Sequence, residues 1–351
     1  MGWGDVPIEG GTETRMIGIP LLGYNAGQWF ESGVSSKDWT GEGGGISNTG
    51  VIVGNILGSN GRPEAYAWTP NHGGFRLGRY LDDDRSVAIA ISHSGAFIVG
   101  NSGKLLEDGT LLVTPVVWMA KVVWNSGQPT LSWEMHALPT GGLEKPDAVF
   151  KDITLNFWGG WGVNDLGQIA GDGWTSNDEG EYWEIAVVWT PTKGGKGWKI
   201  QRLPVADVPY TEALGINDLG EIVGDVWGWT DNFQGARPAL WKQDPKKKTW
   251  SVRILPTTSP DLDYGWSVAW GINELGDIVG YCSDEIWTGH ATRWNSRDRS
   301  FVMSLGFPGE NSNAFGVNNL GIAVGAQTTV SFDENSSPIF GPPQAVAVRF
   351  R

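Results

Sequence analysis

The chain has 351 residues with 52 Gly, 21 Trp and one Cys, and its formal net charge is −14. A negative charge of this size excludes binding of duplex DNA or an anionic membrane through a general positive field, so neither is expected as a partner. The single Cys282 excludes an intramolecular disulfide and a Cys-rich zinc site. No apolar run approaches the ~20 residues that a membrane-spanning helix needs.

The N-terminal residues Met1 to Asp5 have neither the basic start nor the apolar core of a signal peptide. The high content of Gly and Trp with a single Cys is nevertheless typical of extracellular proteins. We therefore expect an extracellular protein, or one on the surface of a cell or particle, and leave its oligomeric state open.

A ten-residue motif recurs along the chain, in the form Gly162-Val-Asn-Asp-Leu-Gly-Gln-Ile-Ala-Gly171. The six copies cover residues 45–54, 90–100, 162–171, 215–224, 271–280 and 316–325. Their turn glycines are Gly50, Gly95, Gly167, Gly220, Gly276 and Gly321. Repeats of about 40–50 residues are typical of β-propeller blades rather than of leucine-rich or ankyrin repeats.

Each copy is predicted to form a β-hairpin. The Asn-Asp-x-Gly segment is turn chemistry, because Asn and Asp bond to the local backbone and Gly adopts a positive φ. An Ala two positions before the first Gly, as in Ala213-Leu-Gly215, places two small residues on one face of a strand. Such crowding is expected where the innermost strands of a propeller meet at its axis.

A third strand is predicted to end in Ala-x-x-Trp, and a fourth to begin with an aromatic residue and end in Leu-Pro. The third-strand aromatics are Trp68, Trp118 or Trp124, Trp189, Trp241, Trp294 and Phe350. The fourth strands cover residues 133–139, 198–204, 250–256 and, more loosely, 301–308. Pro suits the exit from an edge strand, where no ladder donor is needed.

These elements predict an all-β, six-bladed β-propeller that forms a single domain over residues 1–351. Its blades are expected to begin near residues 38, 84, 157, 210, 266 and 311. Residues 1–20 contain a spare strand that would complete the last blade and remove an open sheet edge. The alternative is a seventh, degenerate blade within residues 95–167, where two copies of the motif are most widely separated.

The motif Gly-Ile-Asn-Asp-x-Gly-x-Ile-Val-Gly, followed by Ala-x-x-Trp, resembles the HAF repeats of bacterial, often secreted proteins. The resemblance covers about residues 40–351, although Ser47 and Ser92 replace the Asn in the first two copies. It implies a propeller and an extracellular role, but it carries no catalytic motif. Function therefore has to be argued from the residues.

The repeated turns could either bind a metal ion or serve a purely conformational role. Asn164, Asp165 and their equivalents lack the alternating oxygen ligands and the bidentate acid of a calcium loop, so hairpin turns are predicted. The run Asp82-Asp83-Asp84 is a weak calcium candidate without evident partners. We expect neither a bound metal nor another cofactor.

Many Trp residues lie outside the repeated positions, in segments that propeller topology places on one face. These segments also carry acids, among them Asp172 and Glu212. A recognition surface over blades three to five is predicted from Trp174, Trp227, Trp229, Trp266, Trp287, Tyr264, Asp225, Asp263, Asp284 and Glu285. The alternative is that long loops fold over and bury their own Trp residues.

Trp faces beside acids suit sugars, whose C–H faces stack on rings while their hydroxyls bond to carboxylates. The leading interpretation is a glycan-recognition propeller with carbohydrate as its partner. A glycan-cleaving enzyme, either a glycoside hydrolase or a polysaccharide lyase, could use the same face; its catalytic residues are not identified, and no known catalytic motif is present. The third possibility is a structural assembly or virion-surface propeller.

Overall fold

The computed structural model describes most of the chain after residue 41. The described ranges are 42–69, 73–107, 111–125, 128–141, 156–176, 182–204, 210–230, 233–258, 264–283, 288–306, 311–332, 338–341 and 344–350. Every regular element in these ranges is a β-strand, and none of them contains a helix that could cross a membrane.

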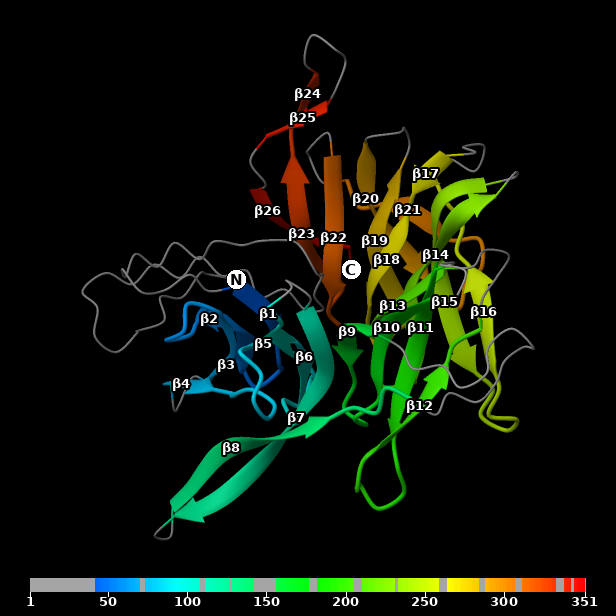
Figure 1. Cartoon of the computed structure of the whole chain (residues 1–351). Coiled ribbons are helices and arrows are strands. Elements are labelled where there is room, and N and C mark those ends of the chain that lie inside the picture. The colour runs from blue at the N-terminus through cyan, green and yellow to red at the C-terminus, as the bar shows by residue number, and fades with distance from the viewer. Residues whose placement is uncertain are drawn as a thin grey trace.

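Six sheets follow one another around a common axis (Figure 1), which confirms the predicted six-bladed β-propeller. Blade one holds β1 (Glu42–Ile46), β2 (Ile52–Leu57), β3 (Pro63–Thr69) and β4 (Gly73–Arg76). Blade two holds β5 (Arg85–Ile91), β6 (Phe97–Leu105), β7 (Leu111–Asn125) and β8 (Gln128–Ala137). Blade three holds β9 (Asn156–Val163), β10 (Ile169–Ser176), β11 (Tyr182–Pro191) and β12 (Trp198–Arg202).

The second half of the ring repeats this antiparallel order. Blade four holds β13 (Tyr210–Ile216), β14 (Ile222–Thr230), β15 (Phe233–Gln243) and β16 (Trp250–Ile254). Blade five holds β18 (Val268–Ile272), β19 (Asp277–Ser283), β20 (Gly289–Asn295) and β21 (Val302–Ser304). Blade six holds β22 (Asn311–Val317), β23 (Ile322–Thr328) and β26 (Gln344–Arg349), and the small hairpin β24 (Val330–Phe332) and β25 (Pro338–Phe340) projects from it.

Two sequence predictions concern how many strands the ring contains. The separation of the second and third motif copies comes partly from one long strand, because Trp118 and Trp124 both lie in β7, whose hairpin with β8 projects from the body in Figure 1. The described sheets contain no seventh blade. The predicted closing strand within residues 1–20 lies outside the described residues.

The first strand of each blade lies nearest the axis, where first strands of neighbouring blades contact one another. Two features of the inner strands explain the repeated Ala-x-Gly: a β-bulge at the middle residue and the close approach of the neighbouring blade at the glycine. In blade four the pairing of β13 with β14 skips Leu214, which forms a β-bulge between Ala213 and Gly215. A Cβ added at Gly215 would lie 2.7 Å from the carbonyl oxygen of Trp270, so this glycine allows blades four and five to approach closely.

The repeated third-strand Trp and the repeated Leu-Pro belong to one interaction between blades. The indole N–H of Trp189 donates to the carbonyl oxygen of Pro139 at 2.8 Å, and that of Trp241 donates to Pro204 at 2.8 Å. Trp294 donates in the same way to Pro256 at 2.6 Å. Each buried indole is thereby fixed to the end of the preceding blade, which gives the buried N–H the partner it needs.

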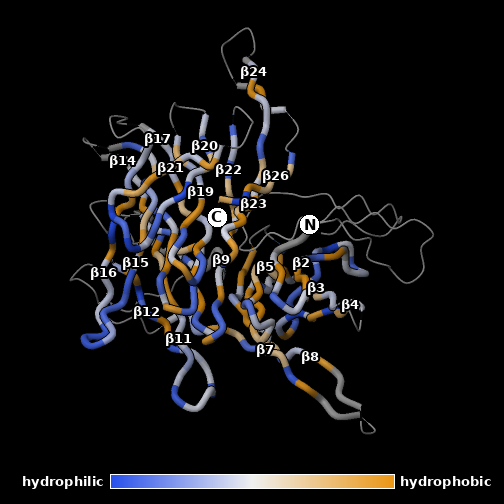
Figure 2. Tube along the Cα trace, turned by 180° about the vertical axis from the view of Figure 1, so that it is seen from behind, coloured by the Kyte–Doolittle hydropathy of each residue, from blue (hydrophilic) through white to orange (hydrophobic). Residues whose placement is uncertain are grey.

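The core consists of apolar layers between successive blades, not of one central cluster. Ile169, Val187 and Trp189 of blade three pack with Val117 of blade two, and similar clusters repeat around the ring. Figure 2 shows these apolar segments as orange stretches within the strands, with hydrophilic segments toward their ends.

Candidate functional site

The connection from blade four to blade five forms an additional strand. This strand, β17 (Tyr264–Trp266), pairs in parallel with the loop end of β15, and Trp266 lies opposite Ala236. Gly235 permits this pairing because its φ is 121° and a Cβ there would lie 2.1 Å from the carbonyl oxygen of Gly265. The connection is therefore hydrogen-bonded to blade four rather than a free loop.

Trp266 is held on its other side by blade five. The Ser283 hydroxyl donates to the carbonyl oxygen of Trp266 at 2.8 Å and accepts from the Trp266 backbone N–H at 3.2 Å. Although its backbone is fixed twice, the Trp266 residue is 43% exposed. An exposed, positioned indole is a feature that packing does not require.

Trp266 continues into two further rings, and we call Tyr210, Trp227 and Trp266 the aromatic strip. The ring centroids of Trp227 and Trp266 are 6.1 Å apart, and Tyr210 stacks on Trp227 at 4.2 Å with an interplanar angle of 18°. Trp227 is half-buried and also packs against Leu214 and Val268. Trp266 is therefore the exposed end of the strip, and Tyr210 and Trp227 are half-buried.

Two acids lie directly beside these rings. Glu212 of β13 is opposite Asp225 of β14, just as Tyr210 is opposite Trp227 two pairs further along. Alternate residues of a strand share a face, so these four side chains lie on the same side of blade four. Asp225 is only 2% exposed, and its buried Oδ1 accepts no hydrogen bond from the residues that the structure describes.

Blade three adds two more buried acids, and we call Asp172, Glu184, Glu212 and Asp225 the carboxyl cluster. Asp172 follows the repeated Gly171 and accepts a hydrogen bond from the Trp161 indole. Glu184 hydrogen-bonds to both Asp172 and Glu212, so the cluster continues from blade three into blade four. Asp172 and Glu184 are 2% and 7% exposed.

Burial and mutual repulsion favour protons on these acids. Burial, with a further contribution from the charge of Glu212, raises the pKa of Glu184 to about 8. Burial followed by the charges of Glu212 and Glu184 raises the pKa of Asp172 and of Asp225 well above the usual range. Burial also raises the pKa of Glu212. Part of the carboxyl cluster is therefore protonated at neutral pH and can donate as well as accept.

Several residues predicted to lie in loops belong to strands. Trp174 lies in β10, Trp227 and Trp229 lie in β14, and Asp225 is buried inside β14. The second strands are longer than expected because they stay paired with the third strands as far as Ser176 and Thr230. Tyr264 is placed by its backbone in β17, whereas Trp287, Asp263, Asp284 and Glu285 lie outside the described residues.

Two other sites considered from the sequence have ordinary surroundings. In the acidic run, Asp82 pairs with Lys104, and Asp84 pairs with Arg85 at 3.0 Å and with Arg62 at 3.5 Å. Cys282 is completely buried, and burial raises the pKa of its thiol. A raised pKa disfavours the nucleophilic thiolate.

Comparison with known proteins adds only the general architecture. No family model and no curated protein sequence matches the chain. Trypanosoma rangeli sialidase is similar in structure at a TM-score of 0.48 and 12% identity, covering 92% of this chain and 57% of the sialidase. Pyrococcus horikoshii acylaminoacyl peptidase has a TM-score of 0.45 at 11% identity, with 90% and 48% covered. Bacillus subtilis levansucrase has a TM-score of 0.34 at 9% identity, with 93% and 89% covered. The chain thus spans a little over half of the length of the sialidase.

Proposed function

We propose that the loop end of blades three to five binds a carbohydrate through the aromatic strip and the carboxyl cluster. The observation that carries this proposal is the fixed but exposed indole of Trp266, continuous with Trp227 and Tyr210. Contiguous exposed apolar surface marks binding sites, and rigid aromatic rings bind at a small entropic cost.

The two halves of this site match the two kinds of surface on a sugar. The C–H faces of a pyranose stack on indole and phenol rings, and its hydroxyls bond to carboxyl groups in either protonation state. The net charge of −14 disfavours an anionic chain. The ligand class is therefore a neutral or cationic oligosaccharide, recognised at the surface of a cell or particle.

Replacing Trp266 with alanine should weaken glycan binding by about 1–2 kcal/mol, because it removes one ring contact and its burial. The melting temperature should hardly change, since Trp266 is 43% exposed and belongs to none of the buried core clusters of the described residues. A glycan array identifies the ligand, and calorimetry on wild type and variant measures the loss.

Leu219→Ala is the matched control, because Leu219 is 63% exposed at the opposite, hairpin-turn end of blade four. It should leave glycan affinity unchanged. A wild-type protein that binds no glycan, or a Trp266→Ala variant that binds as tightly as wild type, would refute the proposal.

A second candidate function, cleavage of a glycosidic bond, is favoured by the proton-holding carboxyl cluster. A glycosidase needs a carboxyl group that stays protonated near neutral pH and a second, ionised one. Glu184, whose pKa is raised to about 8, suits the first role. Release of reducing ends that disappears in Glu184→Gln, with glycan binding retained, would establish the enzyme; binding without any release would leave a recognition protein.

A further inference from the structure

The hairpin turns of the six blades converge at the end of the axis opposite the aromatic strip. One residue of each turn occupies the equivalent position: Asn48, His93, Asp165, Asp218, Glu274 and Asn319. The backbone N–H of Asp165 donates to Asp218 Oδ1 at 2.7 Å, and that of Glu274 donates to Asn319 Oδ1 at 3.0 Å. The repeated acids and amides therefore connect neighbouring turns.

Blade two departs from this arrangement. The N–H of Asn48 in blade one donates to the backbone carbonyl oxygen of His93, at 2.8 Å, and not to its side chain. The imidazole of His93 therefore does not accept the hydrogen bond from the preceding turn, as the side chains of Asp218 and Asn319 do. It points across the axis instead, and its Nδ1 lies 3.5 Å from Oε1 of Glu274 in blade five.

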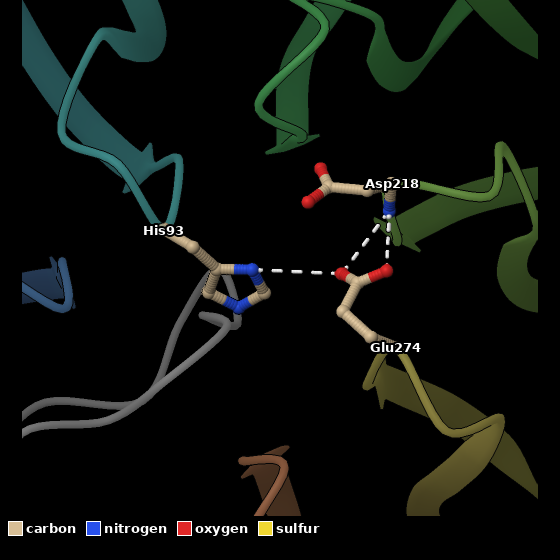
Figure 3. Close-up of side chains that lie close together, drawn as sticks. All are labelled: His93, Asp218 and Glu274. Carbon is tan, nitrogen blue, oxygen red and sulfur yellow. Dashed lines mark hydrogen bonds and ion pairs between the residues drawn. The ribbon is translucent and has the colours of Figure 1, made fainter.

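Asp218 of blade four completes a group that we call the axial trio: His93, Asp218 and Glu274. One nitrogen or oxygen atom from each lies within 4.8 Å of those of the other two. In Figure 3 the imidazole faces the Glu274 carboxylate, and the Asp218 carboxylate lies beside both. Three different blades thus bring three metal-ligating groups to one point.

The charges around the trio favour a cation. Glu274 is partly buried, and Asp218 and Asp165 act on it as repelling negative charges. The side chains of His93 and Glu274 are only 27% and 21% exposed, so solvent screens this repulsion incompletely. The hydrogen bonds that the carboxylates accept from backbone N–H groups leave further lone pairs on each carboxylate.

We propose that the axial trio binds one divalent transition-metal ion, for which Zn²⁺ is the probe. One imidazole nitrogen and two carboxylates supply three protein ligands of the types that zinc accepts, and an open zinc site uses three protein ligands with water in the fourth position. Calcium prefers six to eight oxygen ligands and gains nothing from the imidazole. The ion would join blades two, four and five across the axis and so stabilise the ring.

Titration of the metal-free, untagged chain with ZnCl₂ tests this assignment. One Zn²⁺ per chain is expected, together with a rise of several degrees in Tm at a concentration about 100-fold above Kd. Ca²⁺ in excess should not displace it. Co²⁺ should bind at the same site and give visible absorption bands that Zn²⁺ abolishes.

Two variants assign the ligands. His93→Gln removes the nitrogen ligand, and Glu274→Gln removes a charge but keeps an acceptor for the Asp218 N–H. Each should weaken Zn²⁺ binding at least tenfold. The control is His136→Gln, because His136 lies on the outer strand β8 and is 3.8 Å from Glu134, a surface His–Glu pair away from the axis. Absence of Zn²⁺ binding to wild type, unchanged binding in both ligand variants, or loss of binding in the control would overturn the proposal.

Discussion

Replacing Gly224 with alanine should lower the free energy of unfolding by about 3 kcal/mol. The bulge at Leu214 turns the backbone of β13 so that a Cβ at Gly224 would lie 1.9 Å from the carbonyl oxygen of Glu212. That oxygen belongs to the backbone of the innermost strand, which cannot swing aside as a flexible side chain could. Chemical denaturation of wild type and variant measures the difference.

Gly220→Ala is the matched control in the same hairpin. Gly220 has a φ of 73°, but an added Cβ would meet nothing closer than Gln168 Oε1 at 3.4 Å. The left-handed conformation alone should cost about 1–2 kcal/mol. If Gly224→Ala proves no more destabilising than Gly220→Ala, the close contact created by the bulge is not what requires this glycine.

The contrast between these two glycines shows what the sequence could predict about the fold. Asn-Asp-x-Gly identified the turn at Gly220, because turn chemistry is local. The need for Gly224 depends on how two strands pair. Ala213 and Gly215 are two residues apart in the sequence whether or not Leu214 forms a bulge. The sequence alone therefore predicted a continuous strand here. The repeat therefore predicted the propeller without predicting the reason for its glycines.

The candidate site could be predicted only in part, for a similar reason. The non-repeated Trp residues pointed to blades three to five, but the carboxyl cluster forms across two blades, from one residue on each of four strands, β10, β11, β13 and β14. The sequence identified Asp172 and Glu212 only as acids of that region. It did not identify Glu184, because no motif in the segment around Glu184 indicates a functional residue. One sequence feature could have indicated the carboxyl cluster. The residue directly after the repeated Gly is an amide in blades one and two, Asn55 and Asn101, but an acid in blades three and four, Asp172 and Asp225.

The carboxyl cluster should make the protein more stable in mild acid than in mild base. The pKa of Glu184 is about 8 in the folded chain, against 4.5 for an ordinary glutamate. Between these values the folded state binds more protons than the unfolded state, so stability falls as pH rises through this window. For Glu184 the loss between pH 5 and pH 9 should be on the order of 2–4 kcal/mol.

Glu184→Gln isolates this effect, because glutamine keeps the shape and the hydrogen bonding of the protonated acid but cannot ionise. The variant should match wild type near pH 5 and exceed its stability at pH 9, as measured by urea denaturation at a series of pH values. Glu134→Gln is the control: Glu134 is exposed on β8, and its hydrogen bond to Lys121 lowers its pKa instead. Its pH profile should follow that of wild type above pH 5. Parallel profiles for wild type and Glu184→Gln would show that Glu184 ionises in the folded protein at its ordinary pKa, and the buried acid would then have no proton to give to a bound sugar.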